Sequence, residues 1–104
     1  MTTFDDRENA FESKFAHDAE MQFKVEARRN KLLGLWAAEL LGKSGDAAAA
    51  YAVDVVKSDF EEAGDDDVLR KVAGDLGDKA SEDVIRAKMT ELMKTAKAQM
   101  MEEI

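Results

Sequence analysis

Hydrophobic residues recur every three or four positions through most of the chain, a spacing that predicts amphipathic helices. Short clusters of Gly with Asp or Ser interrupt this pattern at residues 42–46, 64–67 and 74–81. Gly favours the position just after a helix, and Asp or Ser favours the cap of the next one. The pattern therefore predicts four helices, at about 20–41, 46–63, 65–76 and 81–103.

Each predicted helix has one apolar face, and the connections between the helices are short. Short connections favour neighbouring helices that pack against each other. We therefore expect an all-α fold in which residues 20–104 form a four-helix bundle. Its expected core side chains are Leu32, Leu33, Trp36, Ala37, Leu40, Tyr51, Ala52, Val55, Val56, Phe60, Val68, Leu69, Val72, Ala73, Leu76, Val84, Ile85, Met89, Leu92, Met93, Ala96 and Met100.

Residues 1–19 fit this bundle less well. Phe4, Phe11 and Phe15 share one face of a helix. Farther along the same face the residues are polar, and apolar residues return only at Leu33; the polar positions are Asp18, Gln22, Glu26 and Arg29. Residues 1–19 could pack on the bundle as an extra half-helix. They could also form a mobile arm, disordered or frayed when free and helical in a partner's groove, and the polar break favours this arm.

Charge narrows the classes of partner. The net charge is −8, which opposes binding to nucleic acid and to anionic membranes. Residues 54–83 carry eleven acids against four bases, whereas Lys24, Arg28 and Arg29 lie in a short basic stretch. With Lys31 they form a basic stripe, which is either a solvated face partly paired with Glu20 and Glu26 or a site for an anion. With no long apolar run and no signal-peptide pattern at the N-terminus, we expect a cytoplasmic protein without membrane insertion.

The sequence offers no clear catalytic or metal site. It has no Cys, and His17 lacks the second His that a helical metal site requires four residues away. The acids at 65–67 lack the alternating spacing of a calcium loop. No Ser lies in a nucleophile elbow, and a small bundle offers little cleft. We therefore expect a binding protein, not an enzyme, with no required cofactor.

Two stretches of the sequence are distinctive. The first is Phe4-Asp5-Asp6-Arg7-Glu8 with Phe11-Glu12 and Lys14-Phe15-Ala16-His17-Asp18, and the second runs from Ala27-Arg28-Arg29-Asn30-Lys31 through Leu32-Leu33-Gly34-Leu35-Trp36 to Gly42. Together they resemble the zeta subunit of alphaproteobacterial F-type ATP synthases, an intrinsic inhibitor of ATP hydrolysis. The resemblance covers essentially the whole chain.

That resemblance implies a four-helix bundle with a mobile N-terminal inhibitory segment. It implies that this segment inserts at a catalytic interface between alpha and beta subunits, near gamma, and that the chain is peripheral to the inner membrane through the synthase. It also implies weak ADP or ATP binding, for which Lys24, Arg28 and Arg29 are candidates by charge alone.

The residues suggest how such a segment would bind. We expect Phe4, Phe11 and Phe15 to lose their water in the partner's groove, each contributing about 1.5–3 kcal/mol. Charge pairs from Arg7, Glu8 and Lys14 would flank them. The alternative function is an acidic helical adaptor that binds a basic partner through residues 54–83.

Overall fold

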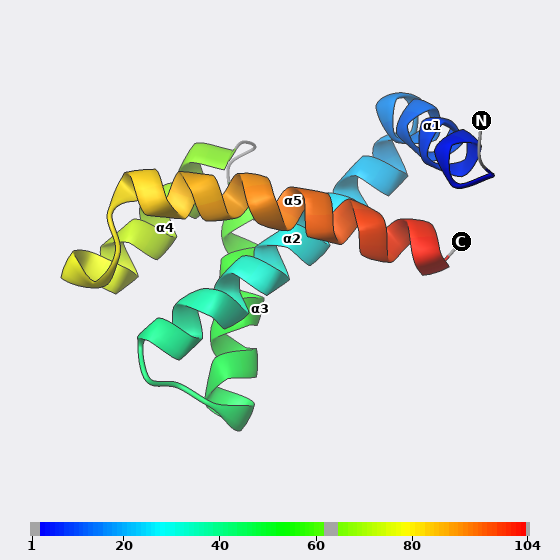
Figure 1. Cartoon of the computed structure of the whole chain (residues 1–104). Helices are drawn as coiled ribbons and strands as arrows, with labels where there is room; N and C mark the ends of the chain where they lie inside the picture. Colours follow the sequence, from blue (N-terminus) through cyan, green and yellow to red (C-terminus); the bar gives the residue numbers. More distant parts are fainter. Residues whose placement is uncertain (1–2, 62–64, 104) are drawn as a thin grey trace.

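Helices make up most of the part of the chain that the structure describes. The structure, a computed structural model, describes the backbone of residues 3–61 and 65–103 and the side chains of residues 9–59 and 65–103. In order, the elements are α1 (Thr3–His17), α2 (Ala19–Leu40), α3 (Gly45–Glu61), α4 (Asp65–Leu76), the 3₁₀ turn η1 (Gly77–Lys79) and α5 (Glu82–Glu103) (Figure 1). The predicted all-α class and the four predicted helices are confirmed; the end predicted for α3, residue 63, lies outside the described residues.

Helices α2 to α5 pack around one main core. Helix α2 lies in the middle and contacts α3, α4 and α5. Every helix of the four contributes fully buried apolar side chains, which explains why none could be stable alone. The buried residues of this core are Leu33, Ala37, Ala38, Tyr51, Val55, Val68, Leu69, Val72, Leu76, Ile85 and Met89.

Local signals set the ends of these helices. After α2, Gly42 adopts a φ of +75°, and the amide of Lys43 donates to the carbonyl of Ala38 at 2.8 Å. The amide of Gly42 donates to Glu39 at 3.1 Å, which completes a Schellman motif. At the start of α5, Ser81 Oγ accepts a hydrogen bond from the amide of Val84, as expected of a cap.

Two predicted core residues are not in the core. Leu40 is 39% exposed and Val84 is 49% exposed. Both lie in a terminal turn of their helix, where the apolar face continues but the neighbouring helices do not cover it. The expected core position Phe60 lies outside the described side chains.

The molecule is elongated because two of its helices extend beyond the main core. Its principal extents are 46, 27 and 26 Å. Helix α1 lies at one end, beside the first turns of α2 and the last turns of α5, so both ends of the chain are at this side of the molecule (Figure 1). None of the described helices is long and apolar enough to cross a bilayer.

Gly34 permits the closest contact between α2 and α3. A Cβ atom at this position would lie 2.6 Å from the Cα of Ala52. We expect Gly34→Ala to lower the free energy of unfolding by about 1–3 kcal/mol, because the two backbones must separate. Urea unfolding measures this loss. The control is Gly74→Ala in α4, where a Cβ would meet nothing within 4 Å; it should leave stability unchanged or raise it by about 0.5–1 kcal/mol. Equal stability of the two variants would contradict the close contact.

Candidate functional site at the N-terminal helix

A corner built from side chains joins α1 to α2. Asp18 has an extended backbone, with φ −114° and ψ 102°, and its Oδ1 accepts a hydrogen bond from the amide of Met21 at 3.1 Å. Gln22 Nε2 donates to the carbonyl of Phe15 at 2.8 Å and to that of Ala16 at 3.3 Å. Asp18 therefore caps α2, and Gln22 satisfies the last carbonyls of α1.

The corner explains part of the polar break in the sequence. The chain changes direction at Asp18, so residues before and after it do not share one helical face. A helical wheel that treats residues 4–40 as one continuous helix is therefore wrong. The polar break that it shows nevertheless begins at Asp18, where α1 and α2 meet. Asp18 and Gln22 are polar because they end one helix and begin another.

A second, smaller cluster holds α1 against the rest of the molecule. Phe11 of α1 is 6% exposed and packs with Met21 and Val25 of α2 and Ala96 of α5. The ring of Phe15 stacks on that of Phe11, with centroids 6.5 Å apart. This cluster is separate from the main core, and partly buried side chains surround it: Phe15, Leu32, Met93, Met100 and Met101.

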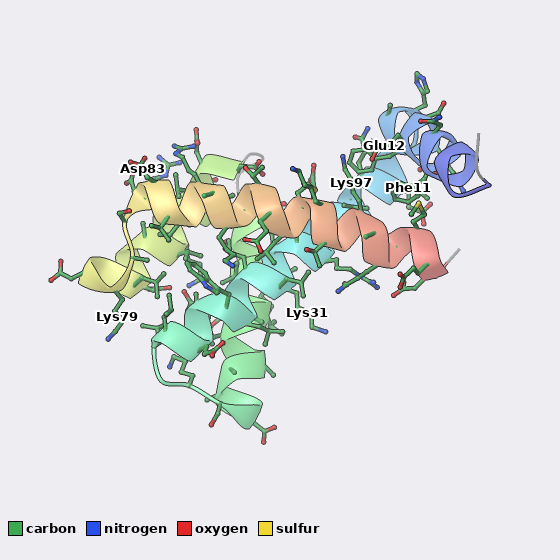
Figure 2. All side chains as sticks on the ribbon, in the orientation of Figure 1. Phe11, Glu12, Lys31, Lys79, Asp83 and Lys97 are labelled. Atoms are coloured by element: carbon green, nitrogen blue, oxygen red, sulfur yellow. The ribbon has the colours of Figure 1, made fainter. Side chains whose placement is uncertain are left out.

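One lysine of α5 contacts α1 in two ways. Lys97 Nζ lies 3.6 Å from Glu12 Oε2 and 4.4 Å from the centroid of the Phe15 ring. The side chains of Glu12 and Lys97 face each other across the gap between the two helices (Figure 2). The ammonium group thus makes an ion pair and a cation–π contact at the edge of the small cluster.

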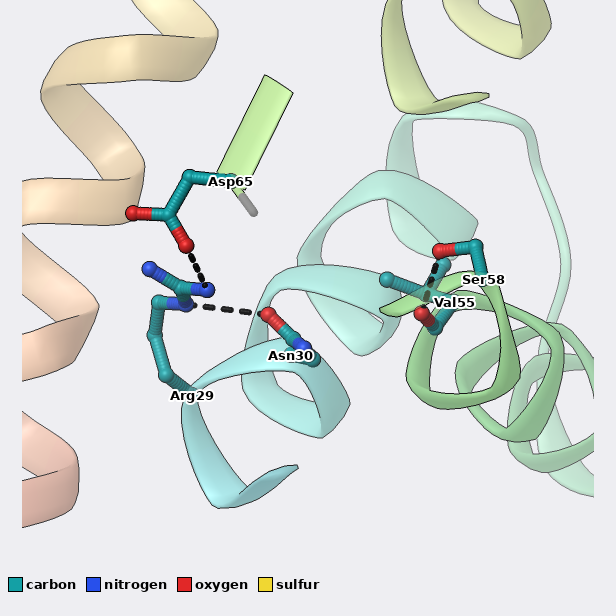
Figure 3. Close-up of polar contacts among 5 residues, drawn as sticks. All are labelled: Arg29, Asn30, Val55, Ser58 and Asp65. Atoms are coloured by element: carbon teal, nitrogen blue, oxygen red, sulfur yellow. Dashed lines mark hydrogen bonds and ion pairs between the residues drawn. The ribbon is translucent and has the colours of Figure 1, made fainter. Parts of the chain in front are cut away.

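A buried arginine accounts for the rest of the polar break. Arg29 of α2 is 2% exposed; its Nε donates to Asn30 Oδ1 at 2.9 Å and its Nη2 to Asp65 Oδ1 at 2.8 Å (Figure 3). This hydrogen bond holds the pKa of Asp65 below its usual value. Partial burial, followed by the charge of Asp59, raises the pKa of Glu26. Arg29 is therefore structural: it ties α2 to the first residue of α4.

The six residues expected to bind a partner fall into two groups. Phe11 is buried, Phe15 is half-buried and Lys14 is exposed. Phe4, Arg7 and Glu8 belong to α1 by their backbone, but their side chains lie outside the described part. The structure thus places the described aromatic residues together on the face of α1 that meets α2 and α5.

Comparison of the sequence with known protein families identifies the family of this chain. A family model described as ATPase inhibitor subunit zeta matches residues 1–99. The chain belongs to the ATPase inhibitor subunit zeta family. A structure solved by NMR in solution is similar, with 67% sequence identity and a TM-score of 0.75 over 81% of this chain and 99% of that one. No curated protein matches. The family is one of inhibitor subunits, so membership supports a regulatory role on ATP synthase.

Three residues of this zeta-family chain are expected at a nucleotide site, and the structure separates Arg29 from the other two. Lys24 pairs with Glu20 at 3.1 Å, and Arg28 donates to Glu103. Lys24 and Arg28 line an open depression of about 550 Å³, whereas Arg29 lines a different one of about 480 Å³. The structure brings Lys24 and Arg28 together but not Arg29.

Two partners in these contacts could not have been found from the sequence. Asp65 is 36 residues from Arg29, and Lys97 is on the last helix whereas Glu12 is on the first. In the sequence, Asp65 is one of three consecutive acids at a helix start, and Lys97 is one of several lysines of α5. Only the packing of the helices shows which of them matters.

Proposed function

We propose that this chain inhibits ATP hydrolysis by F-type ATP synthase, and that α1 is the inhibitory element. In this proposal α1 inserts at a catalytic interface between alpha and beta subunits, near gamma. The association would hold the chain at the inner membrane without insertion into it. The observation that supports it most is the corner at Asp18: α1 is a separate helix that contacts the other helices through a cluster of its own.

The face of α1 has the chemistry of a binding element. Phe11 and Phe15 supply large apolar side chains, and the exposed Lys14 supplies charge at the edge. Aromatic residues surrounded by charge are typical of the few side chains that dominate an interface. An amphipathic helix that places its apolar face in a groove uses this pattern.

Phe11→Ala tests this assignment. We expect it to raise the concentration needed for half-inhibition of ATP hydrolysis by roughly thirtyfold, because a central aromatic side chain contributes about 2 kcal/mol or more to many interfaces. The measurement is a titration of the purified catalytic head of an F-type ATP synthase. The control is Leu35→Ala, a partly exposed apolar residue on α2, which should inhibit like the unchanged protein. An equal loss in both variants would place the inhibitory surface outside α1.

The alternative function, an acidic adaptor acting through residues 54–83, receives less support. Several acids of this segment are used inside the molecule. Asp65 pairs with Arg29, and Asp75 accepts hydrogen bonds from Tyr51 at 2.8 Å and from Lys71 at 3.2 Å. Asp66 lies 3.8 Å from Arg86 of α5. These acids have cationic or hydroxyl partners of their own, which reduces the charge available to a basic partner.

A nucleotide site is a second proposal, carried by the depression beside Lys24 and Arg28. Its volume suits a small ligand, and Phe23, Lys31 and Val56 line it with them. We infer that ADP or ATP would bind here weakly, with its phosphates on the cations. Calorimetric titration with ADP should show about tenfold weaker binding for the double variant Lys24→Ala/Arg28→Ala, as expected when charge-assisted hydrogen bonds are lost. Lys94→Ala, in the other depression, should not change binding; unchanged binding in the double variant would remove the proposal.

A further inference from the structure

The face of α1 that would bind the ATP synthase is already covered by the chain's own helices. Phe11 is 6% exposed, and its neighbours Val25 and Ala96 are fully buried beneath it. The ring of Phe15 is partly covered as well, by the stacked Phe11 ring and by Lys97. One face of a side chain cannot be desolvated against two surfaces at once. Packing against α2 and α5 therefore competes with any insertion of this face into another protein.

Among the described side chains, one ion pair links the covered face of α1 to α5. Of the described α1 side chains, Phe11 is the buried member of this cluster, which also holds Met21, Val25 and Ala96 and is separate from the main core. At its edge, Lys97 makes both the ion pair with Glu12 and the cation–π contact with Phe15. At the other edge, the corner at Asp18 is held by side-chain hydrogen bonds. Opening this contact would leave the main core intact.

We propose that the position of α1 seen here is a self-docked, non-inhibitory state, and that release from α2 and α5 precedes inhibition. This inference rests on the proposed function of α1. Only the undocked fraction binds the synthase, so the apparent affinity is the intrinsic affinity reduced by that fraction. Among the described residues, Lys97 stabilises the docked position without itself belonging to the inhibitory face.

Substitution of Lys97 tests the proposal directly. Lys97→Ala removes a partly exposed ion pair and a partly exposed cation–π contact, so the concentration for half-inhibition of the purified catalytic head should fall by about threefold to tenfold. The control is Lys94→Ala, an exposed lysine one turn earlier on α5, which should leave inhibition unchanged. Equal or weaker inhibition by Lys97→Ala would overturn self-docking as a brake. Failure of the unchanged protein to inhibit would instead overturn the proposed function.

A tether gives a second, independent readout. The chain has no cysteine, so the double variant Glu12→Cys/Lys97→Cys can be joined by a short bismaleimide without side reactions. The tethered protein should lose inhibition at least tenfold, because α1 can no longer leave α5. The same variant with both thiols capped by N-ethylmaleimide should inhibit at least as well as the unchanged protein. Full inhibition by the tethered protein would show that the docked position is the working one and would overturn the proposal. Should capping itself abolish inhibition, the comparison of Lys97→Ala with Lys94→Ala decides.

Discussion

Removal of residues 1–17 is expected to abolish inhibition of ATP hydrolysis while leaving α2 to α5 folded. The deletion keeps Asp18, so the cap of α2 is preserved. It removes Phe11 and Phe15, the described aromatic residues of the proposed inhibitory face. None of the described side chains of α1 belongs to the main core, so the deletion leaves the buried residues of that core in contact with one another.

The shortened protein should lose a little stability. Without Phe11, the small cluster of Met21, Val25 and Ala96 is exposed to water. Burial of one Phe contributes about 1.5–3 kcal/mol, which sets the scale of the expected loss. Circular dichroism and a thermal melt of residues 18–104 measure both helicity and stability. A shortened chain that no longer unfolds cooperatively would show that α1 is part of the folding unit, contrary to the separation of the two clusters.

Arg29→Ala is expected to lower the free energy of unfolding by about 2–3 kcal/mol, through lost packing and lost hydrogen bonds. The side chain is 2% exposed, and it is the hydrogen-bond partner of both Asn30 Oδ1 and Asp65 Oδ1. The substitution leaves the Asn30 side chain buried without this donor and frees the start of α4 from α2. Urea unfolding at neutral pH measures the loss.

Lys24→Ala is the matched control for this substitution. Lys24 lies on the same helix, and its side chain is 58% exposed and pairs with the exposed Glu20. Its loss should change stability by less than about 0.5 kcal/mol. The difference in unfolding free energy between the two variants distinguishes a buried arginine that joins two helices from a lysine on the surface. If Arg29→Ala were as stable as Lys24→Ala, Arg29 would not hold α2 to α4.

The sequence predicts this fold well because the signals that set it are local. Gly42 ends α2 by a positive φ, and Ser81 begins α5 through its side chain. Such caps depend on residues three or four positions apart. The apolar spacing then assigns most buried positions, and it fails at Leu40 and Val84, where coverage depends on how far the neighbouring helix extends.

The candidate site is predicted less completely because its contacts are distant in sequence. The sequence shows Asp18, Gln22 and Arg29 as polar positions that interrupt the apolar face of one helix. In the structure they serve two purposes, a corner between α1 and α2 and an ion pair to α4. The charge pattern groups Arg29 with Lys24 and Arg28. In the structure its side chain lines a different depression from theirs. The mobility of residues 1–19 in the free protein stays a prediction.

The most direct test of the inhibitory role of α1 is steady-state ATP hydrolysis by the purified catalytic head of an F-type ATP synthase. The full-length protein and residues 18–104 are titrated side by side. We predict that the full-length protein suppresses hydrolysis in a saturable manner, and that residues 18–104 leave the rate unchanged at every concentration. Equal inhibition by both proteins, or inhibition by neither, would contradict a role for α1.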